Sequence, residues 1–90
     1  MTPDALRAAI AADCPHRLDD YDWHRDAFGP NEDAFLALMR TEYAISRNPT
    51  LEARINDLHA QAEQAETRAE VIACFQEISR IRREAAEGLK

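Results

Sequence analysis

The chain has 90 residues, enough for one domain near the lower size limit for folding without disulfides or metals. Its net charge of −6 disfavours nucleic acid and anionic membranes as main partners. The same charge favours a basic partner protein, although an acidic surface also serves plain solubility. No segment is long and apolar enough to span a bilayer, and the start lacks the basic region of a signal peptide. We therefore expect a cytoplasmic protein with no membrane contact, in which Cys14 and Cys74 are reduced thiols.

The composition indicates an all-α protein. Glycine occurs only twice, and alanine, leucine, arginine, glutamate and glutamine fill most positions. The five abundant residue types all have high helix propensity. No run alternates apolar and polar residues for long enough to form a strand. The sequence predicts a small helical bundle of four to five helices that forms one domain over residues 1–90.

Turn and capping residues place the boundaries of these helices. Thr2, followed by proline and aspartate, is typical of a helix start. Pro15 separates the first two helices, and Gly29, followed by another proline, ends the second in a left-handed conformation. Asn31 and Thr50 are expected to cap the third and fourth helices. The predicted helices cover residues 3–13, 16–28, 32–47, 51–65 and 68–87.

The apolar positions predict which helix is central and which side chains form the core. Over residues 32–47, apolar side chains recur at spacings of three and four and spread into a broad stripe. A stripe of this width indicates neighbours on two sides. The predicted core consists of Leu6, Ile10, Leu18, Tyr21, Phe28, Phe35, Leu38, Met39, Ile45, Leu51, Ile55, Leu58, Ile72, Phe75 and Ile78.

Residues 51–87 can form either a helical hairpin or one long kinked helix, because neither glycine nor proline interrupts them. Apolar residues keep a heptad spacing from Leu51 to Ile72, and the pattern then shifts. Thr67 and Glu70 also have the spacing of a capping box. We therefore favour a break near Glu66–Thr67 and a hairpin. In either form, residues 51–87 offer a surface for a homodimer.

The segment between residues 13 and 29 is the richest in reactive and charged side chains. On a helix over 16–28, Trp23 lies roughly opposite the core-facing stripe of Leu18, Tyr21, Arg25 and Phe28. An exposed tryptophan among carboxylates suits an arginine- or lysine-rich protein surface, because the ring stacks on guanidinium groups and the acids steer the encounter. The predicted partner-binding residues are Trp23, Asp19, Asp22 and Asp26.

Two alternatives remain open for this segment. Trp23 can instead belong to the core, in contact with the first or the fourth helix. The second alternative is a metal- or small-ligand-binding site built from Cys14, His16, Asp20 and His24, since neighbours at i and i+4 can share one ion. His16 and His24 are two helical turns apart, so one ion would need ligands from another helix. We expect no metal and no cofactor.

The sequence predicts binding and no catalysis. It contains no glycine-rich phosphate loop and no nucleophile-elbow motif. The two helices around Gly29 have the outline of a helix-turn-helix, so a DNA-binding helical dimer is a further alternative. The recognition helix of such a motif would begin with Glu32 and Asp33, whose negative charges repel the DNA phosphates. The expected function is therefore a small acidic interaction module (antitoxin-, inhibitor- or adaptor-like) that binds a basic protein.

Overall fold

The computed structural model describes residues 2–88 and confirms the all-α class, since these residues form helices and no strand. A 3₁₀ turn at Pro15–Arg17 precedes α2, where the sequence predicts a continuous helix from residue 16. No helix of residues 2–88 has the length and hydropathy needed to cross a bilayer. The α-helices are α1 (Pro3–Asp13), α2 (Leu18–Phe28), α3 (Glu32–Ser46), α4 (Pro49–Gln64) and α5 (Arg68–Glu87).

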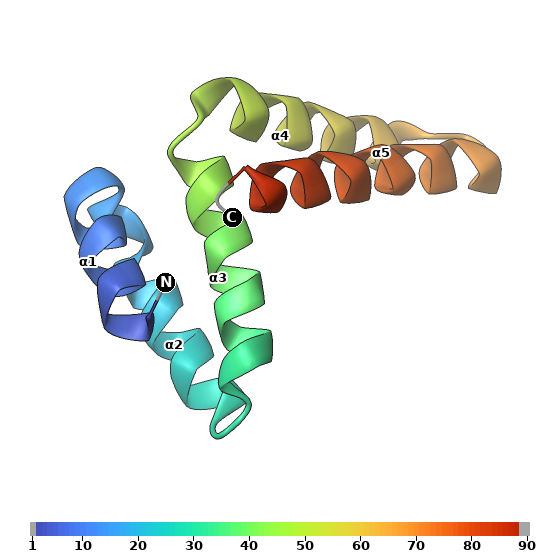
Figure 1. Cartoon of the computed structure of the whole chain (residues 1–90). Coiled ribbons are helices and arrows are strands. Elements are labelled where there is room, and N and C mark those ends of the chain that lie inside the picture. The colour runs from blue at the N-terminus through green and yellow to red at the C-terminus, as the bar shows by residue number, and fades with distance from the viewer. Residues whose placement is uncertain (1, 89–90) are drawn as a thin grey trace.

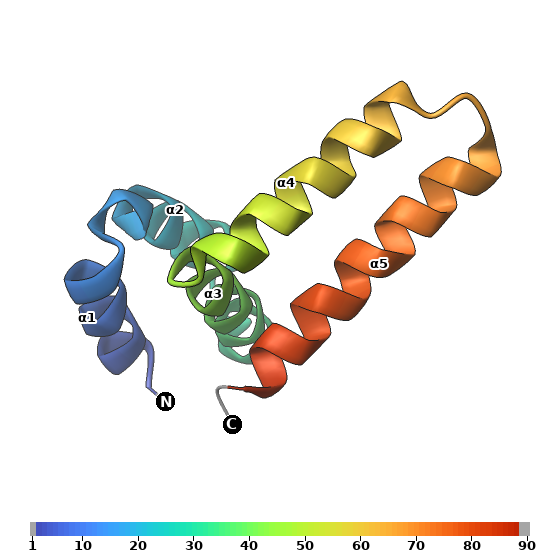
Figure 2. The same cartoon turned by 90° about the horizontal axis from the view of Figure 1, so that it is seen from above.

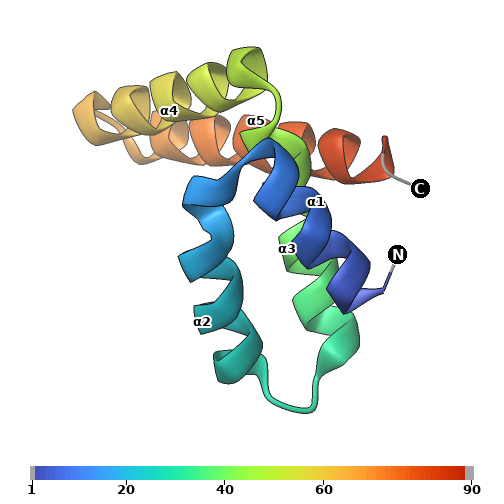
Figure 3. The ribbon, with the colours of Figure 1, turned by 90° about the vertical axis from the view of Figure 1, so that its left-hand side faces the viewer.

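The helices form two groups that share α3. Helices α1, α2 and α3 pack together, while α4 and α5 cross the end of α3 and extend away from it (Figures 1 and 2). Helices α2 and α3 are antiparallel neighbours joined by a short turn, and α1 lies against both (Figure 3). Because α3 contacts each of the other four α-helices, the predicted central position of this helix is confirmed.

The shape is elongated as a result. The radius of gyration is 14.4 Å, whereas a compact domain of this length has roughly 12 Å. The longest dimension is 43 Å, against 27 and 24 Å for the other two. The free half of the α4–α5 hairpin accounts for this extension (Figure 2).

Most predicted helix boundaries are confirmed by the caps that form them. The side chains of Thr2 and Asn31 accept hydrogen bonds from backbone N–H groups in the first turns of α1 and α3. Gly29 ends α2 with a φ of +56°, a value that favours glycine. The predicted cap at Thr50 is wrong: α4 begins at Pro49, and Asn48 caps it through its side-chain carbonyl. Asparagine followed by proline is a strong helix start because proline needs no N–H partner there.

The predicted break in residues 51–87 is confirmed, and the single long helix is excluded. Helix α4 ends at Gln64, and Ala65 has extended backbone. The Thr67 hydroxyl accepts a hydrogen bond from the Glu70 N–H, and the Glu70 carboxylate accepts one from the Glu66 N–H. These two bonds satisfy backbone donors at the start of α5 and turn the chain back along α4.

Two separate apolar clusters hold the helices together, and α3 contributes to both. The first cluster lies between α1, α2 and α3, and the second lies between the end of α3 and the hairpin. The first cluster contains Leu6, Ile10, Cys14, Tyr21, Phe35, Met39 and Tyr43. The second contains Ile45, Ile55, Leu58, Ile78 and Ile81.

Two residues of the predicted core are in fact exposed. Ile72 and Phe75 are 45 % and 47 % exposed. Beyond Ile78, towards the hairpin end, α4 is the one helix beside α5 (Figure 2). The Phe75 ring makes an edge contact with the His59 imidazole of α4, with 5.7 Å between the ring centroids. A single neighbouring helix covers one side of a helix. Around the axis of α5, Ile72 lies about 120° and Phe75 about 60° from the buried Ile78. Four other predicted core residues are half-buried at the cluster edges: Leu18, Phe28, Leu38 and Leu51.

The core also includes positions that the sequence did not single out. Cys14 is buried beside α1 in the first cluster, and burial raises the pKa of its thiol. Ile81 lies three residues after Ile78, on the same side of α5, and belongs to the second cluster. Both cysteines are free.

Two isoleucines of α5 provide a matched test of this packing. Ile78 is 5 % exposed and Ile72 is 45 % exposed. We expect Ile78→Ala to lower the free energy of unfolding by about 2–5 kcal/mol, because it opens a cavity in the second cluster. Ile72→Ala should lower it by less than about 1 kcal/mol, because little buried area is lost. Chemical denaturation measures both values, and equal losses would contradict the assignment of Ile78 to the buried side of α5.

Candidate functional site

The structure places Trp23 on the surface of α2, where it is 67 % exposed. The alternative that Trp23 belongs to the core is therefore wrong. Its ring makes an edge contact with the imidazole of His24, with 5.0 Å between the ring centroids. A monomer of this kind leaves a large aromatic face open to a partner, which is the arrangement expected of an interface anchor.

Asp19 and Asp26 flank Trp23 on the same side of α2, four residues before it and three after it. Both are exposed, and neither forms an ion pair within residues 2–88. Their negative charges are therefore available to an approaching molecule. We call Trp23, Asp19, Asp22 and Asp26 the α2 surface.

Asp22, the fourth predicted site residue, is already engaged inside the molecule. Arg7 of α1 donates two hydrogen bonds to its carboxylate, at 3.1 and 3.0 Å. These bonds lower the pKa of the Asp22 carboxyl. Asp22 thus adds negative charge to the α2 surface, and its contact with Arg7 holds α2 against α1.

A second set of contacts fixes the other side of α2. The buried Tyr21 donates a hydrogen bond from its hydroxyl to the Pro3 carbonyl at 2.8 Å. Arg25 donates to the same hydroxyl at 3.1 Å and lies 3.6 Å from the Asp4 carboxylate. Arg25 was expected on the core-facing stripe, but it is exposed and covers Tyr21 from outside. These bonds orient α2 so that Trp23 faces away from α1.

The proposed metal ligands do not converge. Cys14 is buried in the first cluster, whereas His16 is exposed in the 3₁₀ turn. The His24 ring binds its own helix, with Nδ1 2.7 Å from the Asp20 carbonyl oxygen, so that Nδ1–H is the donor. Within residues 2–88, no three histidine, cysteine or acidic side chains lie close enough to hold one ion.

Asp20 and His24 instead line a cavity of about 200 Å³ between the first three helices. Sequence reasoning missed this cavity, because its lining comes from residues up to 33 positions apart. Its floor is apolar and its rim is polar. The lining residues are Ile10, Arg17, Asp20, His24, Met39, Glu42 and Tyr43.

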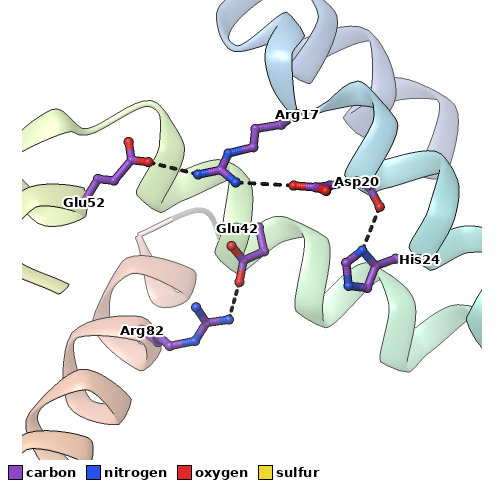
Figure 4. A network of polar contacts seen from close by, with 6 residues as sticks. All are labelled: Arg17, Asp20, His24, Glu42, Glu52 and Arg82. Atoms are coloured by element: carbon purple, nitrogen blue, oxygen red, sulfur yellow. Dashed lines mark hydrogen bonds and ion pairs between the residues drawn. The ribbon is translucent and has the colours of Figure 1, made fainter. Parts of the chain in front are cut away.

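Charged residues around the rim form ion pairs that link the two halves of the molecule (Figure 4). Arg17 binds Asp20 at 3.3 Å and Glu52 of α4 at 2.9 Å. Glu42 of α3 is paired with Arg82 of α5. The Nε atom of Arg17 is buried and has no hydrogen-bond partner among the described residues.

In the α2–α3 helix pair, the second helix begins with two acidic residues. Glu32 and Asp33 are exposed in the first turn of α3. Negative charge at this point repels a phosphate backbone, and it occupies the helix end that would otherwise attract one. The geometry adds nothing in favour of DNA recognition.

The fold and the α2 surface define an acidic, all-α protein with an exposed tryptophan. We found no match to the chain among family models, curated proteins or solved structures. The functional argument therefore rests on the geometry of this chain.

Ionic quenching of Trp23 fluorescence tests the α2 surface directly, because Trp23 is the single tryptophan. In dilute protein we expect a red emission. Relative to the quenching of free tryptophan amide by the same ion, caesium should quench it more efficiently and iodide less efficiently, since the carboxylates attract cations and repel anions. Added salt should remove the difference. In Asp19→Asn/Asp26→Asn, caesium should lose most of its advantage. A blue emission that neither ion quenches would contradict the exposed position of Trp23.

Proposed function

We propose that the protein is a non-enzymatic interaction module that binds a basic partner protein through the α2 surface, in the manner of an antitoxin, an inhibitor or an adaptor. The observation that carries this proposal is the 67 % exposure of Trp23 beside two carboxylates that form no ion pair with any residue from 2 to 88. Tryptophan is strongly enriched among the residues that dominate binding energy at protein interfaces.

The charges and the rigidity of the surface support the same proposal. Residues 1–33 hold three arginines against eight acidic residues, a balance of −5. A field of this sign accelerates the approach of a basic protein. The Trp23 ring can then stack on an arginine side chain of that partner. Because α1 fixes α2 through Asp22 and Tyr21, little ordering is required on binding.

Self-association belongs to the same class of function. We propose that residues 51–87 contribute to a homodimer, because Ile72 and Phe75 leave an apolar face of α5 uncovered. Exposed apolar patches on small proteins commonly mark interaction sites.

Photo-crosslinking from position 23 tests the proposed function. A photoreactive residue replaces Trp23 in the host cells, and a matched control carries it at the exposed Gln61 of α4. We expect position 23 alone to capture a basic protein. Trp23→Ala should then weaken binding of that purified protein by at least about tenfold, and added salt should weaken it further.

Gln61→Ala is the control for the affinity measurement and should leave binding unchanged. Capture of the same protein equally from positions 23 and 61 would contradict the proposal. An affinity that Trp23→Ala does not alter would contradict it as well.

Small-ligand binding is the second candidate function, and the cavity lined by Arg17 and Met39 favours it. Its volume of about 200 Å³ and its lining of apolar and charged side chains suit a small molecule with an apolar body and a polar group. Nuclear magnetic resonance with millimolar organic acids and amides should shift the Met39 methyl and His24 ring signals. Arg17→Gln should abolish the shifts, and Arg54→Gln on the outside of α4 should not. Unchanged signals across the set would exclude this function.

A further inference from the structure

The large apolar side chains that residues 2–88 leave exposed lie on two surfaces. They are Trp23 on α2, and Ile72 and Phe75 on α5. Ile72 and Phe75 border a shallow groove of about 630 Å³. We call this groove together with Arg68 the α5 stripe. The groove is lined by Val71, Ile72, Phe75, Gln76, Ser79 and Arg83.

The α5 stripe is basic. Arg68 lies one helical turn before Ile72 on the same face, and Arg83 lines the groove at its other end. Neither arginine forms an ion pair within residues 2–88. By contrast, Arg80 and Arg82 of the same helix are both paired with glutamates. The stripe therefore presents an apolar centre with an unneutralised positive charge towards each end.

These charges disfavour the pairing of two α5 stripes. In a parallel arrangement each arginine faces its own copy, and in an antiparallel arrangement centred on the stripe Arg68 faces Arg83. Like charges in such contacts oppose association. An occupant with an apolar anchor and acidic flanks would instead be complementary.

The α2 surface has this chemistry. Trp23 supplies the apolar anchor, and the exposed Asp19 and Asp26 supply a negative charge on either side of it along the helix. Asp19 and Asp26 are seven positions apart, which is about 10 Å along the helix axis. The arginines of the stripe are more widely separated, but their long side chains can reach inwards to the carboxylates.

We propose that two copies of the chain associate head to tail, with the α2 surface of one copy docked on the α5 stripe of the next. Trp23 covers Ile72 and Phe75, and the two aspartates face Arg68 and Arg83. This inference rests on the proposed function, since it takes the α5 stripe of a second copy as one basic surface that the α2 surface binds, although the chain as a whole carries a net charge of −6. Because the two contacting surfaces differ, the assembly either closes into a ring or grows as a chain.

The contact is one helix face on another, at the small end of protein interfaces, so the association should be weak and concentration-dependent. Charge reversal on each surface in turn provides the test. The first variant is Asp19→Lys/Asp26→Lys, and the second is Arg68→Glu/Arg83→Glu. All four positions are exposed, and circular dichroism verifies the fold of each variant.

Sedimentation equilibrium gives the mass of each variant as a function of concentration. We expect the wild type to increase in mass with concentration, and each variant alone to associate at least tenfold more weakly. An equimolar mixture of the two variants should associate again, because each reversed surface then meets a complementary one. Trp23→Ala and Phe75→Ala, which change no charge, should each weaken wild-type association by a similar factor.

Three outcomes would overturn the inference. The wild type stays monomeric up to millimolar concentration; the mixture of the two variants fails to associate; or the aspartate variant still associates alone while the arginine variant does not. None of them removes the proposed function, which fails separately if Trp23→Ala leaves the binding of the cross-linked basic protein unchanged.

Discussion

Burial of α3 in both apolar clusters is the constraint on which the rest of the structure depends. Phe35, Met39 and Tyr43 pack into the first cluster, and Ile45 packs into the second. A chain of 90 residues has little apolar area to distribute. Dividing that area between two clusters fixes α1 and α2 on one part of α3 and the hairpin on another. It also leaves no third layer to cover the outer faces of α2 and α5.

The two exposed surfaces follow from this division. Helix α2 has one buried side, which Asp22 and Tyr21 hold against α1, so that Trp23 faces solvent. Helix α5 extends past α3, and its outer half has α4 as its one neighbour. Ile72 and Phe75 consequently lie outside the side of α5 that is buried against α4. Their apolar area contributes nothing to the stability of a monomer. It contributes favourable free energy to an assembly in which binding buries it.

Local signals in the sequence were sufficient for the helices and for part of the site. Capping side chains such as Thr67 act within four residues, so their positions predicted the break before α5. The helical angle of Trp23 placed it opposite the core-facing stripe of α2, but it left open a core position against the first or the fourth helix, which the structure excludes. Features that depend on distant residues were missed, including the cavity at Arg17 and the exposure of Phe75. The cavity depends on how α1, α2 and α3 pack together, and the exposure of Phe75 depends on where α3 ends relative to the hairpin. No local pattern contains that information.

Native-state hydrogen exchange tests the shared role of α3 most directly, since it measures the free energy of opening for each amide. In dilute protein we predict that the amides around Met39 and Tyr43 exchange only through global unfolding. Amides near Ile72, at the free end of the hairpin, should exchange through local opening at much lower free energy. Equal or greater protection near Ile72 would contradict the account, because it would mean that the hairpin is stable without α3.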